Sequence, residues 1–316
     1  MAAAVDPITI ELVDNALYST EKEMEATIVR TAVSVVIREV YDFGIATLDT
    51  RGRLVHGLSM GGSVILDTFP LDRIDEGDVF IFSDPYLSQG EMTHLGDTQL
   101  CRPVFWEGQL VAFAAVWGHH MDVGGISTAG LPATSTEIYL EGIQIPPVKL
   151  YSRGELNEAI LQIMARNSRA PEMMIGDTLA LAAACTVLEY RLHELLGKFG
   201  LETVLACFDI FARRAHDAMQ RLIDALPEER FAFDDYLDDD GVEEGHPHLC
   251  MAIEKHDGRL IVDYSGTSDQ AKGPINLIMN HNRQKLEMWR YLINWLGPEI
   301  GLDDQTSPNY GIFDLI

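Results

Sequence analysis

The fold is decided by one stretch, residues 83–125, which reads SDPYLSQGEMTHLGDTQLCRPVFWEGQLVAFAAVWGHHMDVGG. Two apolar runs lie within it, on either side of Trp106-Glu107-Gly108. A Glu-Gly pair can supply the positive backbone φ angles that a two-residue β-turn requires. We therefore predict a β-hairpin over residues 99–117, and the two ends of a hairpin lie side by side.

Histidine and aspartate residues stand at both ends of this predicted hairpin. His94 is followed by Asp97, and His119 is followed by Asp122, each at a spacing of i, i+3. Convergence of the two ends would bring together two imidazoles and two carboxylates, which are ligands that divalent metals accept. The alternative is that each His-x-x-Asp pair forms an ordinary surface hydrogen bond, and the pattern alone leaves both interpretations open.

The composition excludes several classes of partner. The 316 residues are 47% hydrophobic and carry a net charge of −26, which argues against binding to nucleic acid or to anionic membranes. The N-terminus lacks the basic and apolar regions of a signal peptide, and we found no apolar run long enough to span a bilayer. We expect a cytoplasmic protein with reduced thiols, because its four cysteines lack CxxC spacing: Cys101, Cys185, Cys207 and Cys250.

The segments before the hairpin predict a helix followed by strands. Asp6-Pro7 is typical of a helix start, and the apolar stripe after it continues to about Val33. Residues 33–40 are rich in the β-branched side chains that favour strands. A hairpin turning at residues 49–52 and a buried strand before Ser83 complete this part.

The segments after the hairpin predict a flexible loop, a helical middle and a second hairpin. Residues 124–135 have loop composition, and residues 154–226 show helical periodicity interrupted at Pro171 and Gly176. We interpret residues 231–245 as an acidic linker and residues 246–250 as an edge strand. His256-Asp257-Gly258 indicates a hairpin turn, and a last amphipathic helix is expected over residues 286–296.

These elements predict an α+β fold with mixed, largely antiparallel sheets built from hairpins, a long N-terminal helix and a central helical region. The expected division is into a hairpin-rich domain over residues 1–150, a helical region over residues 151–230 and a second α+β segment over residues 231–316.

Several motifs resemble those of the hydantoinase B/oxoprolinase family, in order along nearly the whole chain. They are Asp84-Pro85-Tyr86, Thr93-His94-Leu95-Gly96-Asp97, Gly118-His119-His120-Met121-Asp122-Val123-Gly124-Gly125, residues 136–143, residues 145–150, Arg169-Ala170-Pro171 with Gly176-Asp177, residues 262–268 and Gly273-Pro274-Ile275-Asn276. Two departures are the inserted residues 87–92 and Gly96, where the family commonly has proline. The chain also stops well before the family's usual length, so that residues 231–316 look truncated.

The resemblance implies a set of site residues. His94, Asp97 and His119 would bind a divalent metal, with Asp42 as a fourth ligand, and the ligands suit zinc, manganese or iron alike. His120 and Asp122 would be catalytic groups beside the metal. Whether His119 or His120 is the ligand stays open, although adjacent strand residues point to opposite faces and both are not expected to bind. Glu141 and Arg169 would contact the substrate, with Arg169 as an anion clamp.

The resemblance also implies a reaction. We expect a B-type subunit of a hetero-oligomeric, ATP-dependent enzyme that hydrolyses a small cyclic amide such as a hydantoin, oxoproline or a lactam. A hydantoinase A-like partner subunit would bind the ATP, since this chain has no P-loop. One alternative is a subunit of an acetone or acetophenone carboxylase, and another is a non-catalytic assembly subunit.

Overall fold

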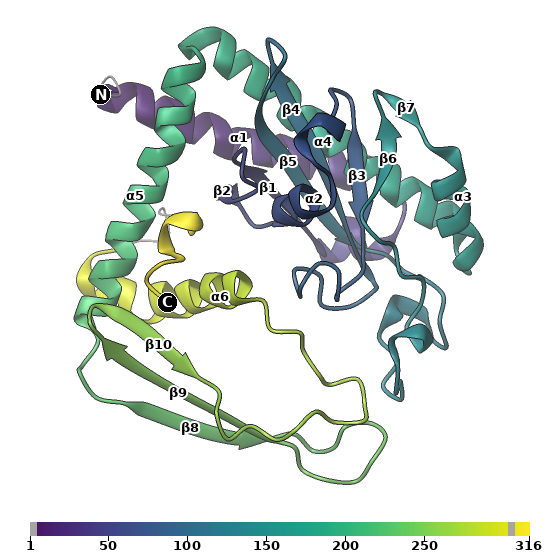
Figure 1. Ribbon diagram of the computed structural model, residues 1–316, viewed down its shortest axis with the longest axis vertical. Coiled ribbons are helices and arrows are strands. Elements are labelled where there is room, and N and C mark those ends of the chain that lie inside the picture. The colour runs from purple at the N-terminus through teal and green to yellow at the C-terminus, as the bar shows by residue number, and fades with distance from the viewer. Residues whose placement is uncertain (1–4, 303–306) are drawn as a thin grey trace. The chain divides into compact units, whose positions relative to one another are not determined.

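The computed structural model describes residues 5–302 and 307–316, and it confirms the α+β fold with antiparallel sheets (Figure 1). The chain forms two compact units. The first comprises Met1–Leu131 and Glu141–Ile210, and the second comprises Pro132–Leu140 and Phe211–Ile316. Helix α5, Leu201–Ala225, therefore contributes residues to both.

The first unit is built on a seven-stranded sheet with the strand order β2-β1-β5-β4-β3-β6-β7. Every neighbouring pair in this sheet is antiparallel. The strands are β1 Phe43–Leu48, β2 Leu54–Gly57, β3 Val79–Phe82, β4 Asp97–Trp106, β5 Gln109–His119, β6 Val148–Ser152 and β7 Glu155–Leu156.

The predicted central hairpin is confirmed as β4–β5, which lies in the middle of the sheet. Glu107 and Gly108 form its turn with φ angles of 50° and 78°, the positive values that the sequence required. The hairpin extends by two residues beyond the predicted range at each end, because Asp97 pairs with His119. Its register thus brings the two histidine-bearing ends together.

Helices α1 (Pro7–Thr31) and α4 (Pro171–Phe199) pack on each other, and α4 packs on β4 and β5. The Asp6 carboxylate accepts hydrogen bonds from the first N–H groups of α1, which confirms the predicted helix start. Helix α4 is long and apolar enough to cross a membrane, but half of its most apolar window is buried within the fold. We interpret α4 as a core helix. Helices α2 (Gly62–Thr68) and α3 (Glu158–Asn167) also belong to this unit.

Two predictions for this unit are wrong. Residues 33–40 are not a strand: Val36–Val40 forms a short π-helix that ends at Tyr41, whose φ is 61°. The coiling places Ile37 beneath Gly118, so its branched side chain is buried without strand pairing. Gly176 does not interrupt the helical region but lies inside α4, where the absence of a side chain lets Val33 approach.

The second unit holds a three-stranded antiparallel sheet in the order β10-β9-β8 and helix α6, His281–Leu296. The turn at Asp257-Gly258 between β9 (His248–His256) and β10 (Arg259–Asp263) is as predicted. The acidic linker prediction is wrong for residues 231–236, which form β8, Phe231–Tyr236. Because β8 pairs with β9, the predicted edge strand at residues 246–250 is also wrong: β9 is central.

Candidate metal centre

Three of the predicted ligands meet at the open end of the β4–β5 hairpin. His94 Nε2 lies 3.4 Å from Asp97 Oδ2, and His119 Nδ1 lies 3.0 Å from Asp97 Oδ1. One ligand atom from each of the three residues lies within 4.8 Å of the other two. The two imidazole rings are 5.2 Å apart between centroids and meet edge to face.

Strand pairing explains this convergence. Asp97 is the first residue of β4 and His119 is the last of β5, and they are direct cross-strand partners whose side chains share a face of the sheet. Gly96 allows the close approach, because a Cβ atom there would lie 2.6 Å from His119 Cε1 and 2.7 Å from the Ala129 carbonyl oxygen. His94 reaches the same point from the loop before β4.

Asp42 stands at the edge of this group. Its carbonyl oxygen accepts a hydrogen bond of 3.0 Å from the His119 N–H, which continues the pairing of β1 with β5. Its carboxylate Oδ2 lies 4.0 Å from His119 Nδ1, and 41% of the side chain is exposed. Asp42 is therefore the most solvent-accessible of the four predicted ligands.

The donor set and its spacing fit a divalent metal. A tetrahedral ion with bonds of about 2.0–2.1 Å has ligand atoms about 3.3 Å apart. The separations of 3.0 and 3.4 Å are close to that edge but involve different oxygens of Asp97; with one ligand atom from each residue, the three atoms lie within 4.8 Å of one another, and Asp42 Oδ2 is 4.0 Å from His119 Nδ1. Two imidazoles with two carboxylates suit zinc, manganese or iron(II).

The electrostatics of His119 are set by its neighbours. Burial lowers the pKa of this imidazole, but the hydrogen bond and negative charge of Asp97, with the charge of Asp42, raise it above the ordinary value of 6.5. The local field is therefore negative at the point where the ligand atoms converge. Such a field favours a cation, whether a proton or a metal ion.

His120 points the opposite way. Its N–H donates to the Gly96 carbonyl oxygen, and alternation along the strand sends its side chain to the face opposite that of His119. Its ring is 1% exposed, and burial lowers its pKa to about 4. The structure thus groups His119, and not His120, with His94 and Asp97.

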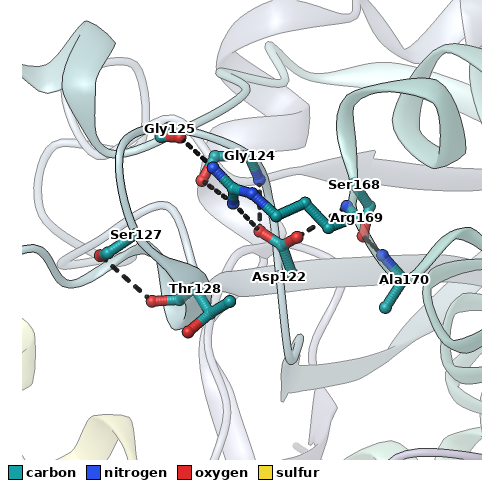
Figure 2. A network of polar contacts seen from close by, with 8 residues as sticks. All are labelled: Asp122, Gly124, Gly125, Ser127, Thr128, Ser168, Arg169 and Ala170. Atoms are coloured by element: carbon teal, nitrogen blue, oxygen red, sulfur yellow. Dashed lines mark hydrogen bonds and ion pairs between the residues drawn. The ribbon is translucent and has the colours of Figure 1, made fainter.

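Asp122 and Arg169 bind each other (Figure 2). The Arg169 backbone N–H and guanidinium Nη1 donate to the two Asp122 carboxylate oxygens at 2.6 and 2.9 Å. The guanidinium also donates to the carbonyl oxygens of Gly124 and Gly125, and the Gly124 N–H donates to Asp122 Oδ1. Arg169 is therefore engaged in fixing the loop after β5, which differs from the anion clamp that we expected.

Glu141 lies on the segment that runs beside the same loop. The neighbouring Ile143 N–H donates to the Val123 carbonyl oxygen at 2.9 Å, and Gly142 packs closely on Val123. Burial raises the pKa of the Glu141 carboxyl. The structure does not group Glu141 with the three converging ligands.

Sequence reasoning missed two buried carboxyl groups near this region. Glu91, in the loop before His94, accepts a hydrogen bond of 2.7 Å from the Ser63 hydroxyl, and burial raises its pKa to about 7. Asp177, on α4, is fully buried. The only sequence signal for either was the Gly176-Asp177 pair among the family-like motifs.

Comparison with known proteins agrees with this architecture. A family model described as hydantoinase B/oxoprolinase matches residues 6–314. Caprolactamase subunit beta of Pseudomonas jessenii is 33% identical over 260 residues, which cover 79% of this chain and 44% of that protein. The acetophenone carboxylase delta subunit of Aromatoleum aromaticum is 29% identical over 214 residues, or 67% of this chain and 31% of the relative.

A solved structure shows the same fold. The crystal structure of the ATP-dependent caprolactamase from Pseudomonas jessenii superposes with a TM-score of 0.81 at 28% identity, covering 99% of this chain and 54% of the matched one. The chain thus spans about half the length of the caprolactamase chain that it matches, and 44% of caprolactamase subunit beta.

Proposed function

This chain belongs to the hydantoinase B/oxoprolinase family, and we propose on that premise that it acts as the B-type subunit of an ATP-dependent cyclic amide hydrolase. The substrate class would be a hydantoin, oxoproline or a lactam. A separate hydantoinase A-like subunit would use ATP to activate the amide, and this chain would complete the hydrolysis in the cytoplasm.

The observation that carries the proposal is the convergence of His94, Asp97 and His119 within 4.8 Å. These residues, with Asp42, would hold a divalent metal. Such an ion, when bound, polarises a carbonyl group or lowers the pKa of water so that hydrolysis proceeds at neutral pH.

The roles of the protein's own groups follow from their contacts. Asp97 interacts with both imidazoles, so that its carboxylate orients His94 and His119 at once. Asp42, which is the most exposed of the four, would be the ligand most accessible to a substrate arriving from solvent. The Asp122–Arg169 pair would hold the loop after β5 in place and act on the substrate only through that loop.

Metal analysis of purified variants tests the proposal. We expect one divalent ion per chain in the parent protein, and its loss in His94→Ala and in His119→Ala. His193→Ala is the matched control, because His193 contacts Trp106 and the Phe105 carbonyl oxygen near the hairpin's turn, away from its open end. Equal metal content in all four proteins would refute the proposed site.

Activity with the ATP-using partner subunit tests the reaction. The His94→Ala variant should lose ATP-dependent hydrolysis, whereas His193→Ala should retain it. Unchanged activity of His94→Ala would favour a role in assembly alone.

A carboxylase subunit is the second candidate, favoured by the similarity to the acetophenone carboxylase delta subunit. The two reactions differ in the nucleophile, which is water in one and an enol-type carbon that meets activated CO₂ in the other. Consumption of bicarbonate by the reconstituted enzyme would identify the carboxylase, and hydrolysis without it would identify the amide hydrolase.

A further inference from the structure

Three buried side chains behind the ligand group have polar atoms with no hydrogen-bond partner among the residues that the structure describes. They are Thr98 at its hydroxyl oxygen, His120 at both ring nitrogens and Asp177 at Oδ2. The residues are 0%, 1% and 0% exposed. Native proteins rarely leave such atoms unsatisfied, so each one calls for an explanation.

The three residues belong to the same layer, between the sheet and α4. Thr98 is the cross-strand partner of Gly118, and a Cβ atom on Gly118 would meet Leu181 of α4 and Ile37. The Thr98 side chain therefore points toward α4. His120 follows Gly118 by two residues and continues on that face, the face on which α4, with the buried Asp177, packs against β5.

Asp177 also anchors the segment that leads to Asp42. Its Oδ1 accepts hydrogen bonds from the backbone N–H groups of Val33 and Ser34 at 2.7 and 3.0 Å. Gly176 permits this approach, because a Cβ atom there would lie 2.4 Å from Val33 Cγ2. One carboxylate oxygen is thus occupied by the backbone, and the other remains for a second partner.

We propose that a buried water site lies between the sheet and α4, formed by Asp177 Oδ2, the His120 imidazole and the Thr98 hydroxyl, and that Asp177 is a positioning residue for the metal centre. A water molecule there has the two to four polar partners that buried waters require. The water can donate hydrogen bonds to the Asp177 carboxylate and to one His120 ring nitrogen, and it can accept a hydrogen bond from the Thr98 hydroxyl.

The consequence for the site comes from where the three residues lie in the chain. Thr98 and His120 directly follow Asp97 and His119, and the segment held by Asp177 Oδ1 continues to Asp42. Asp177 therefore supports the backbone next to three of the four proposed metal ligands, Asp97, His119 and Asp42, from the side of the sheet that faces α4. This consequence, unlike the water site, rests on the proposed function.

A high-resolution crystal structure of the protein tests the water site directly. We expect density for solvent within hydrogen-bond distance of Asp177 Oδ2 and a His120 ring nitrogen. A direct contact between Asp177 and His120, or the absence of solvent density between them, would overturn the proposal. The result does not depend on metal, so it stands apart from any failure of the proposed function.

Two variants of Asp177 test its positioning role. Asp177→Asn keeps an oxygen for the Val33 and Ser34 N–H groups but replaces the charged Oδ2, whereas Asp177→Ala removes both. Thr178→Val is the matched control, because Thr178 is a buried neighbour on α4 that donates to the Met174 carbonyl oxygen of its own helix.

Nitrogen NMR of ¹⁵N-histidine-labelled protein reports on the environment of the His120 ring, and chelator competition measures metal affinity. We expect altered His120 ring signals in both Asp177 variants and not in Thr178→Val. Metal affinity should fall about tenfold in Asp177→Ala and recover in part in Asp177→Asn. Unchanged His120 signals in both Asp177 variants, or an equal change in Thr178→Val, would overturn the positioning role. If the parent protein binds no metal, the proposed function fails, and the density and NMR results still decide the water site.

Discussion

The stability of the first unit should depend on pH through His56. This imidazole, on β2, is 6% exposed and lies between two carboxylates of α1: Glu21 contacts Nδ1, and Asp14 Oδ1 is 3.5 Å from Nε2. Burial lowers the pKa of His56, but the two carboxylates outweigh it and raise the pKa to about 9. Protonated His56 therefore ties α1 to the sheet across the neutral pH range.

The magnitude follows from the shift. An unfolded histidine has a pKa of 6.5, and a rise to about 9 corresponds to roughly 3 kcal/mol of added stability. Because the folded pKa is the higher one, this contribution is complete below about pH 6.5 and is lost as the pH rises through about 9. The protein should thus be less stable at alkaline pH, because the contact between α1 and β2 through His56 is weakened there.

Urea unfolding of the parent protein and of His56→Gln, followed by circular dichroism across this pH range, measures the effect. The variant should have a lower free energy of unfolding than the parent at pH 6. The difference between the two proteins should be roughly 3 kcal/mol larger at pH 6 than at pH 10. Thr178→Val, which changes a buried residue of the same unit that does not titrate, should show no such trend. A difference between His56→Gln and the parent that stays constant with pH would refute the reasoning.

Three further predictions concern the surroundings of the candidate metal centre. Burial raises the pKa of Glu91 to about 7, above the unfolded value of 4.5, so that its ionised form destabilises the folded protein at alkaline pH. Glu91→Gln should therefore raise the free energy of unfolding at pH 8, by up to about 3 kcal/mol, and have little effect at pH 4. Urea unfolding at the two pH values measures the difference. Arg169→Met should lower the free energy of unfolding by about 1–3 kcal/mol, because it leaves Asp122 buried without its cation, and limited proteolysis should then cut the loop after β5 faster than in the parent. Gly96→Ala should reduce metal content, because the added methyl group would lie 2.6 Å from His119 Cε1 and 2.7 Å from the Ala129 carbonyl oxygen, so that the histidine and the loop facing it must both shift. Parent-like metal content in that variant would contradict the packing described.

The hairpin and the convergence of His94, Asp97 and His119 at its open end could be predicted from the sequence, because both depend on pairing within one short stretch. The Glu107-Gly108 turn pairs Trp106 with Gln109, and a register shift between Val104 and Phe105, which the sequence did not predict, then makes Asp97 and His119 partners. The opposite orientation of His119 and His120 follows from strand alternation alone. Asp42 required the family resemblance, since its position depends on the pairing of β1 with β5.

The misses came from contacts between distant segments. Residues 33–40 have strand-like composition, but Asp177 holds the start of this segment from a helix 144 residues away, and the chain coils instead. The ion pair of Arg169 with Asp122 was not indicated by the sequence, because Asp122 lies 47 residues earlier. The acidic residues of β8 concealed a strand that only its pairing with β9 reveals.

The most direct test of the central claim is anomalous X-ray scattering at the absorption edge of the metal found in the purified protein. The proposed metal centre requires one strong peak at the open end of the β4–β5 hairpin, about 2.0–2.2 Å from nitrogen atoms of His94 and His119 and from a carboxylate oxygen of Asp97. A crystal that contains the metal but shows no anomalous peak among these three residues would contradict it.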